Sequence, residues 1–360
     1  MGDDAPSTER ERLKDYSKRV FGLLHGAVTS ALIHLGDQLG LYRALAEGGP
    51  ARSEELAERT GLQERWVREW LYNQGAAGLL ELLPEGRFGL SAEGRAVLAE
   101  EDHPAFGAGM FSQLPQTLAV AARLPESFRS GLGLPYDAFG PEGARGVERG
   151  FAPWYKNFLV PYGIGGVSGL REKLEAGGCV ADVGCGSGLA LLELARAFPE
   201  ADLHGFDISE HALERAEANR SSAALANVAF HDAHREPLPD DGRFDLVLTF
   251  DCLHDMTHPE VVVGQIRRAI AGDGVWLIAD IKSFPTFEEN VKRNPMSAMM
   301  YGLSVLTCMS SALSEPGGAG LGTLGFHEQL ARDMTRAAGF TRFRRMELDH
   351  PVNAFYEVRP

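Results

Sequence analysis

Cysteine is scarce in this sequence: there are four among 360 residues, and no two of them stand in a C-x-x-C spacing. Disulfide frameworks and zinc fingers need cysteines that are paired or closely spaced in a motif. The scarcity argues against both kinds of scaffold. We therefore expect a reducing, cytoplasmic compartment and no bound metal.

Long apolar runs and positive charge are also in short supply. We find no apolar run that approaches the length of a membrane span, and residues 1–18 are charged rather than signal-like. Asp and Glu number 50 against 35 Lys and Arg, which gives a net charge of −15. Because nucleic acids and anionic membranes attract clustered Lys and Arg, we expect neither as a partner.

One glycine-rich stretch organises the chain. An apolar, strand-like run ends at Asp182, glycines follow at alternate positions (Gly184, Gly186 and Gly188), and a helical pattern starts at Leu189. A strand, a tight turn and a helix N-terminus bring backbone N–H groups close to a nucleotide-like ligand. The spacing is G-x-G-x-G rather than the G-x-G-x-x-G of dinucleotide binders, and no phosphate-loop Lys follows. An acid just before the turn suits an ammonium group better than a pyrophosphate.

Further strand and helix patterns alternate after this turn, as a doubly wound sheet requires. Expected strands end at Asp207, at Asp232-Ala233, at Phe250 and at Asp280. Ligands of open α/β sheets bind at such carboxyl ends. Asp207 lies about 20 residues beyond the glycine turn, where a carboxylate can accept hydrogen bonds from the hydroxyls of a ribose. These landmarks predict an α/β fold with a ligand at one edge of its sheet.

Asp182-Val-Gly184-Cys-Gly186-Ser-Gly188 resembles the first motif of the class I S-adenosylmethionine-dependent methyltransferases, (D/E)-x-G-x-G-x-G. The resemblance implies a Rossmann-like methyltransferase sheet and S-adenosyl-L-methionine as cofactor. By position in the family's pattern, the acid after the third strand would bind the adenine amino group. The cofactor-binding residues that we expect are Asp182, Gly184, Cys185, Gly186, Gly188, Asp207, Ile208, Asp232, Ala233 and Phe250.

The N-terminal region resembles a winged helix. Two short helical patterns, 53–62 and 63–75, precede a hairpin pattern over 78–90. Small-molecule O-methyltransferases of the resembled family carry such a domain before the catalytic domain, where it serves in dimerisation and as a lid. The alternative interpretation is a helix around Arg65 and Arg68 that reads DNA. Residues 1–100 carry 12 Lys and Arg against 16 Asp and Glu, so no basic face is expected, and we favour the lid-and-dimer interpretation.

We expect four parts in all. Residues 1–18 form a mobile tail, 19–100 the winged-helix domain, 101–162 a helical linker, and 163–360 the catalytic domain. An apolar, Met- and Gly-rich segment at 282–323 interrupts the catalytic domain and is expected to act as a lid that shapes an apolar pocket, although core or dimer interface fits its composition equally well.

His254 is the candidate general base for methylation of a hydroxyl group. In caffeic-acid-type O-methyltransferases, which the chain resembles, the base belongs to a His-Asp-Trp sequence after the fourth strand. Here the sequence is His254-Asp255-Met256, which keeps His-Asp and loses the aromatic residue. The family also has an acid at the end of the fifth strand that orients the histidine, and Asp280 stands there.

Other interpretations remain open. His254 lines the pocket without moving a proton if the acceptor is an amine, a thiol or a carbon. A metal held by His254, His258 and Asp251 is less well supported, because two histidines lack a convincing third ligand. We expect a homodimer acting on a small, partly apolar acceptor, with a cofactor-sensing winged-helix regulator as the least favoured alternative.

Overall fold

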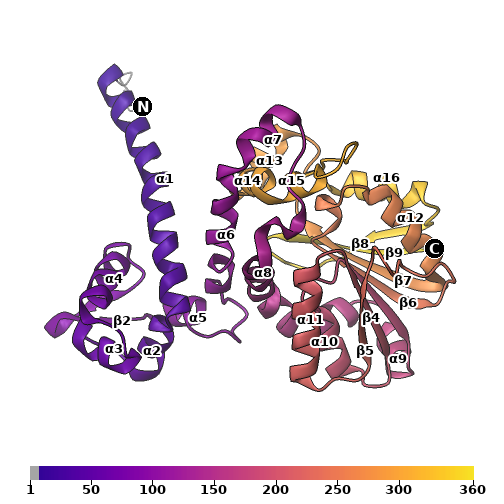
Figure 1. Ribbon diagram of the computed structural model, residues 1–360, viewed down its shortest axis with the longest axis horizontal. Helices are drawn as coiled ribbons and strands as arrows, with labels where there is room; N and C mark the ends of the chain where they lie inside the picture. The colour runs from indigo at the N-terminus through magenta and orange to yellow at the C-terminus, as the bar shows by residue number, and fades with distance from the viewer. Residues whose placement is uncertain (1–7) are drawn as a thin grey trace, which may run out of the picture. The chain divides into compact units, whose positions relative to one another are not determined.

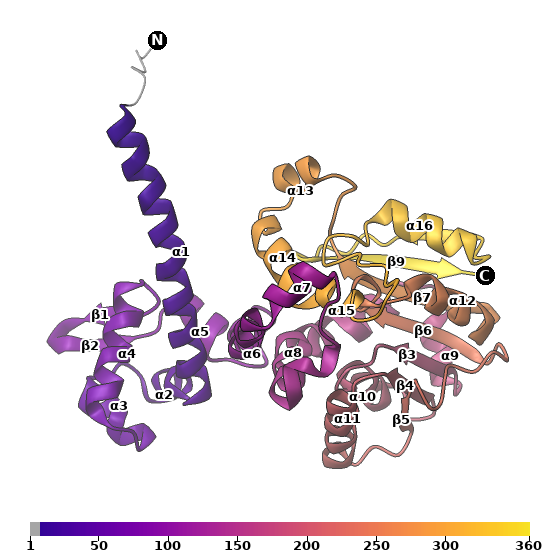
Figure 2. The same ribbon diagram turned by 45° about the horizontal axis from the view of Figure 1, so that its top comes forward.

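The structure is a computed structural model that describes residues 8–360 (Figures 1 and 2). The chain divides into two compact units, one up to Leu114 and one from Pro115 to Pro360. The expected helical linker over 101–162 is therefore split by this boundary, and most of it belongs to the C-terminal unit. The two units are described one after the other.

The N-terminal unit contains five helices among its described residues, with a two-stranded antiparallel hairpin before the last of them. Its elements are α1 (Glu9–Gln38), α2 (Leu41–Gly48), α3 (Ser53–Thr60), α4 (Glu64–Ala76), β1 (Glu81–Leu83), the 3₁₀ turn η1 (Pro84–Gly86), β2 (Arg87–Gly89), α5 (Ala92–Leu98) and the 3₁₀ turn η2 (Ala108–Phe111). Aromatic and leucine side chains from α2, α3, α4 and the hairpin form its core. The winged-helix arrangement inferred from the sequence is confirmed by this element order.

Helix α1 begins earlier than expected. The backbone N–H of Thr8 donates to Glu11 Oε2 at 2.7 Å, and the N–H of Glu11 donates to Thr8 Oγ1 at 3.3 Å. This capping box satisfies N–H groups that a helix start otherwise leaves without partners. The expected mobile tail is therefore wrong from Glu9 onward, and its residues 1–7 lie outside the described part.

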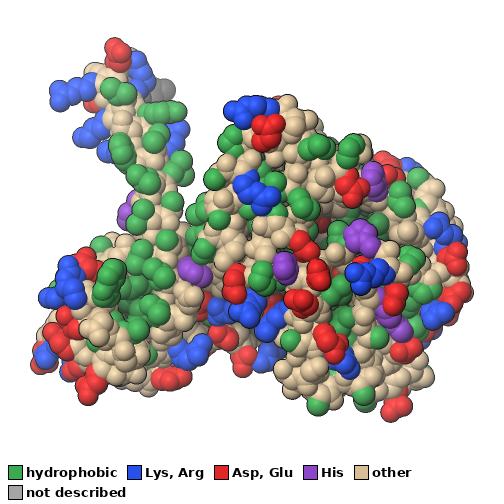
Figure 3. All heavy atoms as spheres, in the orientation of Figure 1, with side chains coloured by type: hydrophobic (Ala, Val, Ile, Leu, Met, Phe, Trp, Pro, Cys, Tyr) green, Lys and Arg blue, Asp and Glu red, His purple; other side chains and the backbone are tan. Residues whose placement is uncertain are grey.

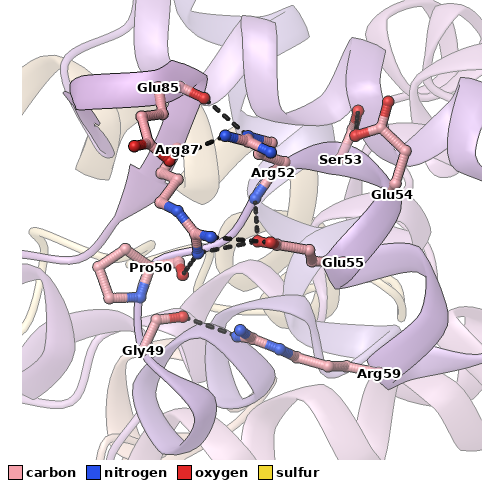
Figure 4. A network of polar contacts seen from close by, with 9 residues as sticks. All are labelled: Gly49, Pro50, Arg52, Ser53, Glu54, Glu55, Arg59, Glu85 and Arg87. Carbon is pink, nitrogen blue, oxygen red and sulfur yellow. Dashed lines mark hydrogen bonds and ion pairs between the residues drawn. The ribbon is translucent and has the colours of Figure 1, made fainter.

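An ion-pair network joins the hairpin to α3 (Figure 4). Arg87 on β2 makes a bidentate pair with Glu55, both contacts at 2.9 Å. Arg52 donates to the carboxylate and the carbonyl oxygen of Glu85, and Arg59 donates to the carbonyl of Gly49. These arginines are thus engaged within the domain.

The C-terminal unit is built on a seven-stranded sheet of order β5-β4-β3-β6-β7-β9-β8. The strands are β3 (Cys179–Val183), β4 (Asp202–Asp207), β5 (Val228–Asp232), β6 (Phe244–Phe250), β7 (Ile270–Ile281), β8 (Arg342–Arg345) and β9 (Asn353–Arg359). The first five pair in parallel, while β9 is antiparallel to both of its neighbours. The strand order reverses between β3 and β6, which is where ligands bind in such sheets.

Helices cover both faces of this sheet, and one apolar layer lies under each set (Figures 1 and 2). One face packs against α9 (Leu170–Glu175) and α10 (Leu189–Ala197), beside which lies α11 (Glu210–Ala223). The other packs against α12 (Pro259–Ala269) and α16 (Glu328–Ala337). The predicted α/β methyltransferase sheet is confirmed.

Short helices precede and interrupt the sheet. Before it come α6 (Leu114–Ala119), η3 (Val120–Ala122), α7 (Leu124–Ser130), η4 (Tyr136–Phe139), α8 (Gly140–Trp154) and the π-helical η5 (Tyr155–Ile164); η6 (Leu253–Asp255) follows β6. The segment 282–323 is helical rather than loop-like, with α13 (Phe287–Arg293), α14 (Ser297–Leu303), the π-turn η7 (Ser304–Cys308) and α15 (Met309–Ala312).

Helix α1 corrects one expectation from the sequence. Within residues 8–360 it is the single helix that is long and apolar enough, by length and composition, to cross a membrane; its window has a mean hydropathy of 1.2 and is 17% buried. Glycines and hydroxyl residues interrupt the apolar side chains, so no continuous run is visible although the average is high. Core helices and signal sequences pass the same test.

Two glycines of the turn after β3 allow a matched test of the fold. Gly188 has φ of 78°, and a Cβ built on it would lie 2.3 Å from the ring of Phe230. Gly186 has φ of 54°, but its Cβ would meet no atom within 4 Å. We expect Gly188→Ala to lower the free energy of unfolding by about 2–4 kcal/mol, and Gly186→Ala by about 1 kcal/mol. Denaturant unfolding measures both, and equal losses would contradict the packing described.

Candidate active site

A buried carboxylate lies near the end of β3, just before the glycine turn. Asp182, on β3, is 2% exposed, and its Oδ1 has no hydrogen-bond partner among residues 8–360. Burial, with a smaller contribution from the charge of Asp207, raises the pKa of Asp182 to about 8. A buried acceptor without a donor is unfavourable, so this oxygen is suited to a cationic or N–H-bearing ligand.

Asp207 links the end of β4 to the glycine turn. Its Oδ2 accepts the N–H of Gly186 at 2.7 Å, and its Oδ1 accepts the N–H of Ser209 at 2.9 Å. Burial raises the pKa of Asp207, whereas these backbone hydrogen bonds lower it. The next residue, Ile208, is 56% exposed, so an apolar side chain stands beside the carboxylate.

The end of β5 lies against the end of β4. Asp232 is in register with Asp207, and the N–H of Ala233 donates to the carbonyl of Asp207 at 2.9 Å. The carboxylate of Asp232 accepts the N–H of His234 at 3.0 Å and pairs with the exposed Arg235 at 3.1 Å. The acids expected from three strands thus meet at one edge of the sheet.

His254 and Asp280 form a buried pair at the ends of β6 and β7. Nδ1 of His254 lies 2.7 Å from Oδ1 of Asp280, and the side chains are 4% and 1% exposed. The N–H of Ile281 donates to the same oxygen at 2.8 Å, which fixes the carboxylate. Burial alone would lower the pKa of His254, but the charge of Asp280, the Cys308 side chain and the hydrogen bonds to both raise it well above its usual value.

Two more acids surround this pair. Burial and the charge of Asp280 raise the pKa of Asp251 to about 7, and Asp251 has φ of 51° and accepts a hydrogen bond from Asn353 at 2.5 Å. Burial raises the pKa of Asp255 to about 7 as well, although the charge of His254 opposes the shift. In both acids the cost of removing a charge from water dominates.

Some residues of the site lie outside the set that sequence reasoning found. Burial raises the pKa of Tyr155 and of Tyr136 well above the usual value, and the charge of Asp182 raises it further at Tyr155, as the charge of Asp255 does at Tyr136. Asp137 accepts hydrogen bonds from the hydroxyl of Ser209 and the N–H of Glu210. The aromatic stretch before β3 was the available signal for Tyr155; nothing in the sequence marked Asp137.

Phe250 and Cys185 complete the expected set. Phe250 packs edge-on against Trp154, with ring centroids 5.4 Å apart, and against Tyr155 at 6.0 Å. Trp154 also stacks on Phe355, so this part of the aromatic stretch belongs to the core, as expected. Cys185 is 8% exposed, and burial raises the pKa of its thiol.

The metal alternative that used His258 is not supported. Its nearest acids are Glu260 and Glu315, each 3.9 Å away, and His258 joins none of the ligand clusters among the described residues. His254 itself belongs to two such clusters, one with Asp255 and Cys308 and one with Asp251 and Asp280.

The site has a strong charge character. The largest charge effects on its buried acids come from other acids and from His254. Carboxylates that are held out of water close to one another raise the free energy of the site, and a cationic ligand lowers it. The orphaned oxygen of Asp182 and the free space at Gly186 fit the ammonium-bearing end of S-adenosylmethionine.

Comparison with known proteins supports this interpretation. Residues 174–334 match the family described as a methyltransferase domain, and residues 27–99 match the Rv2258c-like winged HTH domain. The fold and the site define a Rossmann-like methyltransferase. More particularly, the chain carries a methyltransferase domain that follows an Rv2258c-like winged helix-turn-helix domain, and these matches support an S-adenosylmethionine-dependent methyltransferase.

Solved structures of low sequence identity share the whole fold. Human N-acetylserotonin methyltransferase in complex with S-adenosylmethionine is 17% identical, with a TM-score of 0.69, over 100% of this chain and 99% of that chain. A putative O-methyltransferase from Nostoc punctiforme is 18% identical, with a TM-score of 0.69, over 94% and 98%.

Curated relatives match shorter regions. Dimethylglycine N-methyltransferase from Parasynechococcus marenigrum is 27% identical over 194 residues, which are 52% of this chain and 68% of that protein. Ribosomal RNA large subunit methyltransferase G from Shewanella sp. is 43% identical over 84 residues, so the match spans 22% of each protein.

Proposed function

We propose that this protein transfers a methyl group from S-adenosylmethionine to a hydroxyl group of a small, partly apolar acceptor, with His254 as general base. The observation that carries the proposal is the buried His254–Asp280 contact of 2.7 Å at the carboxyl edge of the sheet. O-methylation needs a base at this point, because the acceptor hydroxyl must lose its proton.

The expected cofactor residues have separate tasks. Asp182 would face the ammonium group, and Asp207 would accept the ribose hydroxyls. Asp232, with Ala233 and Ile208, would hold the adenine end, and the remaining expected residues, from the glycine turn and Phe250, would line the space between them. When bound, S-adenosylmethionine supplies a methyl group already activated for displacement.

His254 would take the proton at Nε2. A proton on Nδ1 can be shared with the carboxylate of Asp280, which fixes the tautomer and stabilises the cation that forms. The side chain of His254 is 4% exposed, so bulk water has little access to it. The pocket would hold the reacting groups in line. The exclusion of water would strengthen the electrostatic interactions between them.

The segment 282–323 would shape the acceptor pocket. Its Met300 packs with Ile281 and Leu324 in a small apolar cluster, beside which lie Met296 and Tyr301. Methionine adapts to irregular apolar surfaces, and this supports an acceptor with an apolar body. The closing of this segment as a lid remains a proposal.

Substitution of the base tests the chemistry. We expect His254→Ala to bind S-adenosylmethionine normally and to lose about 10²–10⁴-fold in kcat, the usual contribution of a positioned base. Transfer of a labelled methyl group across a panel of phenols, alcohols, carboxylic acids, amines and thiols identifies the acceptor. If His254→Ala keeps most of its turnover, His254 is not the general base, and the acceptor atom is more readily a nitrogen, a sulfur or a carbon.

The pH profile gives a second readout of the same pair. Catalysis needs neutral His254 and its pKa lies above 6.5, so kcat/KM should rise with pH through a midpoint above 6.5. Asp280→Asn removes the charge that raises this pKa, so its midpoint should move to lower pH, with a smaller loss of kcat than His254→Ala shows. If the rise of kcat/KM with pH persists in His254→Ala, the titrating group is not His254, and this would contradict the proposal.

The regulator alternative has less support. In the winged domain Arg65 and Arg68 pair with Glu69 and Glu64 on the same helix, and Arg52 and Arg87 lie in the network of Figure 4. DNA phosphates would have to compete with these carboxylates. A lid or dimer module is the better interpretation.

We also propose that the protein is a homodimer held through α1. Hydrophobic side chains run along this helix in Figure 3, and Tyr16, Phe21, Leu23 and Leu24 are between 59% and 74% exposed. Exposed apolar surface of this extent marks an interaction site. A second copy fits better than a lipid bilayer, because basic residues of the first turns are interspersed with Glu9, Glu11 and Asp15.

Light scattering tests the dimer. We expect a dimer at micromolar concentration, and a dissociation constant raised at least about tenfold in Leu24→Glu, since burial of a leucine contributes about 1.5–3 kcal/mol. Lys18→Ala on the same helix is the control and should leave the dimer intact. A fully active monomer, or binding of the wild-type chain to lipid vesicles through α1, would contradict the proposal.

A further inference from the structure

A second group of metal-ligating side chains lies at the opposite end of the sheet from the glycine turn. Cys179 is the first residue of β3, and Asp202 is the first residue of β4. The register pairs these two residues directly, and His204 follows two positions later on the same face of β4. One ligand atom from each of the three lies within 4.8 Å of the other two.

His204 has a nitrogen without a hydrogen-bond partner. Its Nε2 is buried and lies 3.2 Å from Oδ2 of Asp202, yet makes no hydrogen bond within the described part of the chain. Its Nδ1 lies 3.0 Å from Nε2 of His231, with the two ring planes 25° from parallel, and Nδ1 of His231 lies 2.7 Å from Oε2 of Glu236. If each histidine carries its proton on Nδ1, His231 donates to Glu236 and His204 donates to Nε2 of His231.

This arrangement leaves a lone pair on Nε2 of His204, facing a carboxylate and a thiol. In a metal-bound histidine, one ring nitrogen binds the ion and the N–H of the other usually donates to a carboxylate, a carbonyl or a water. The hydrogen-bonded chain from His204 to Glu236 provides this arrangement. In this tautomer a ring nitrogen and a carboxylate oxygen face each other as two acceptors, an arrangement that a cation between them would stabilise. The set of sulfur, nitrogen and oxygen ligands is the one that zinc accepts.

We propose that Cys179, Asp202 and His204 bind a zinc ion, or a similar divalent transition metal ion, with water as the fourth ligand. The side chain of Asp202 is 69% exposed, so solvent and the ion have access. Binding forms one bond each to sulfur, nitrogen and oxygen, and it releases the thiol proton of Cys179 to solvent. Of the cations near the thiol, Arg243 pairs with Asp241 and Lys173 pairs with Asp245, so neither is an unpaired positive charge there.

The site would connect the first residues of two neighbouring strands. It lies at the amino ends of β3 and β4, whereas the residues proposed for methyl transfer lie at the carboxyl ends. The ion therefore acts on stability rather than on the chemical step. The cysteine spacing did not predict it, because its ligands come from two strands that only the fold brings together.

Cobalt titration of the full-length, metal-free protein tests the proposal. We expect one Co²⁺ per chain, with a thiolate-to-cobalt charge-transfer band in the near ultraviolet that Zn²⁺ abolishes by displacement. Cys179→Ser should lose the band. Asp202→Asn, which alters an exposed side chain, should bind at least about tenfold more weakly, and His231→Ala about 10–100-fold more weakly.

Cys308→Ser is the matched control, because Cys308 belongs to the cluster beside His254. It should retain the cobalt band and the affinity for Zn²⁺. A band that disappears in Cys308→Ser and persists in Cys179→Ser would overturn the proposal and place the ion beside the catalytic pair. Failure of the wild-type chain to bind Co²⁺ at one equivalent would also overturn it, as would unchanged affinity in Asp202→Asn.

Discussion

The structure depends on a group of carboxylates held out of water at one edge of the sheet. Burial keeps Asp182, Asp251 and Asp255 partly protonated near neutral pH, with pKa values of about 7 to 8. Ionisation of any of them without a cation is unfavourable in this environment. The pocket therefore favours a ligand that brings positive charge, which the sulfonium and ammonium groups of S-adenosylmethionine supply.

The fold creates this environment from strand ends and two covering segments. Parallel strands bring Asp182, Asp207 and Asp280 to the same edge, and the glycine turn between β3 and α10 leaves open space at Gly186. Tyr155 from the helical segment before β3 adds an aromatic surface close to Asp182. The same burial that raises the pKa values of the acids also excludes water from His254, so binding and proposed base catalysis share one cause.

Much of the architecture could be predicted, because its signals are local. The alternation of strands and helices, the glycine turn and the position of an acid at each strand end are visible in short windows, and His254 lies against Asp280 as the pattern implied. Their roles in binding and catalysis are predictions still. The start of α1 was missed although Thr8 and Glu11 form a readable capping box.

Other parts of the site depend on contacts between distant segments. Asn353 donates to Asp251 from the last strand, Asp137 joins Ser209 from a short turn, and Cys308 lies near His254 from an inserted helix. None of these has a spacing that relates it to its partner. The unit boundary at Leu114 likewise reflects packing rather than a composition change, so the linker expected over 101–162 could not be divided correctly from the sequence.

Proton release on cofactor binding tests the central claim most directly. Calorimetry near pH 6.5, in buffers of different ionisation enthalpy, compares the wild-type chain with Asp182→Asn. At this pH Asp182 is mostly protonated, since its pKa is about 8, and a cationic ligand should favour its ionised form. We expect the wild type to release protons on binding S-adenosylmethionine and Asp182→Asn to release fewer and bind more weakly. Binding without proton release in the wild type, or equal release in both proteins, would contradict the account.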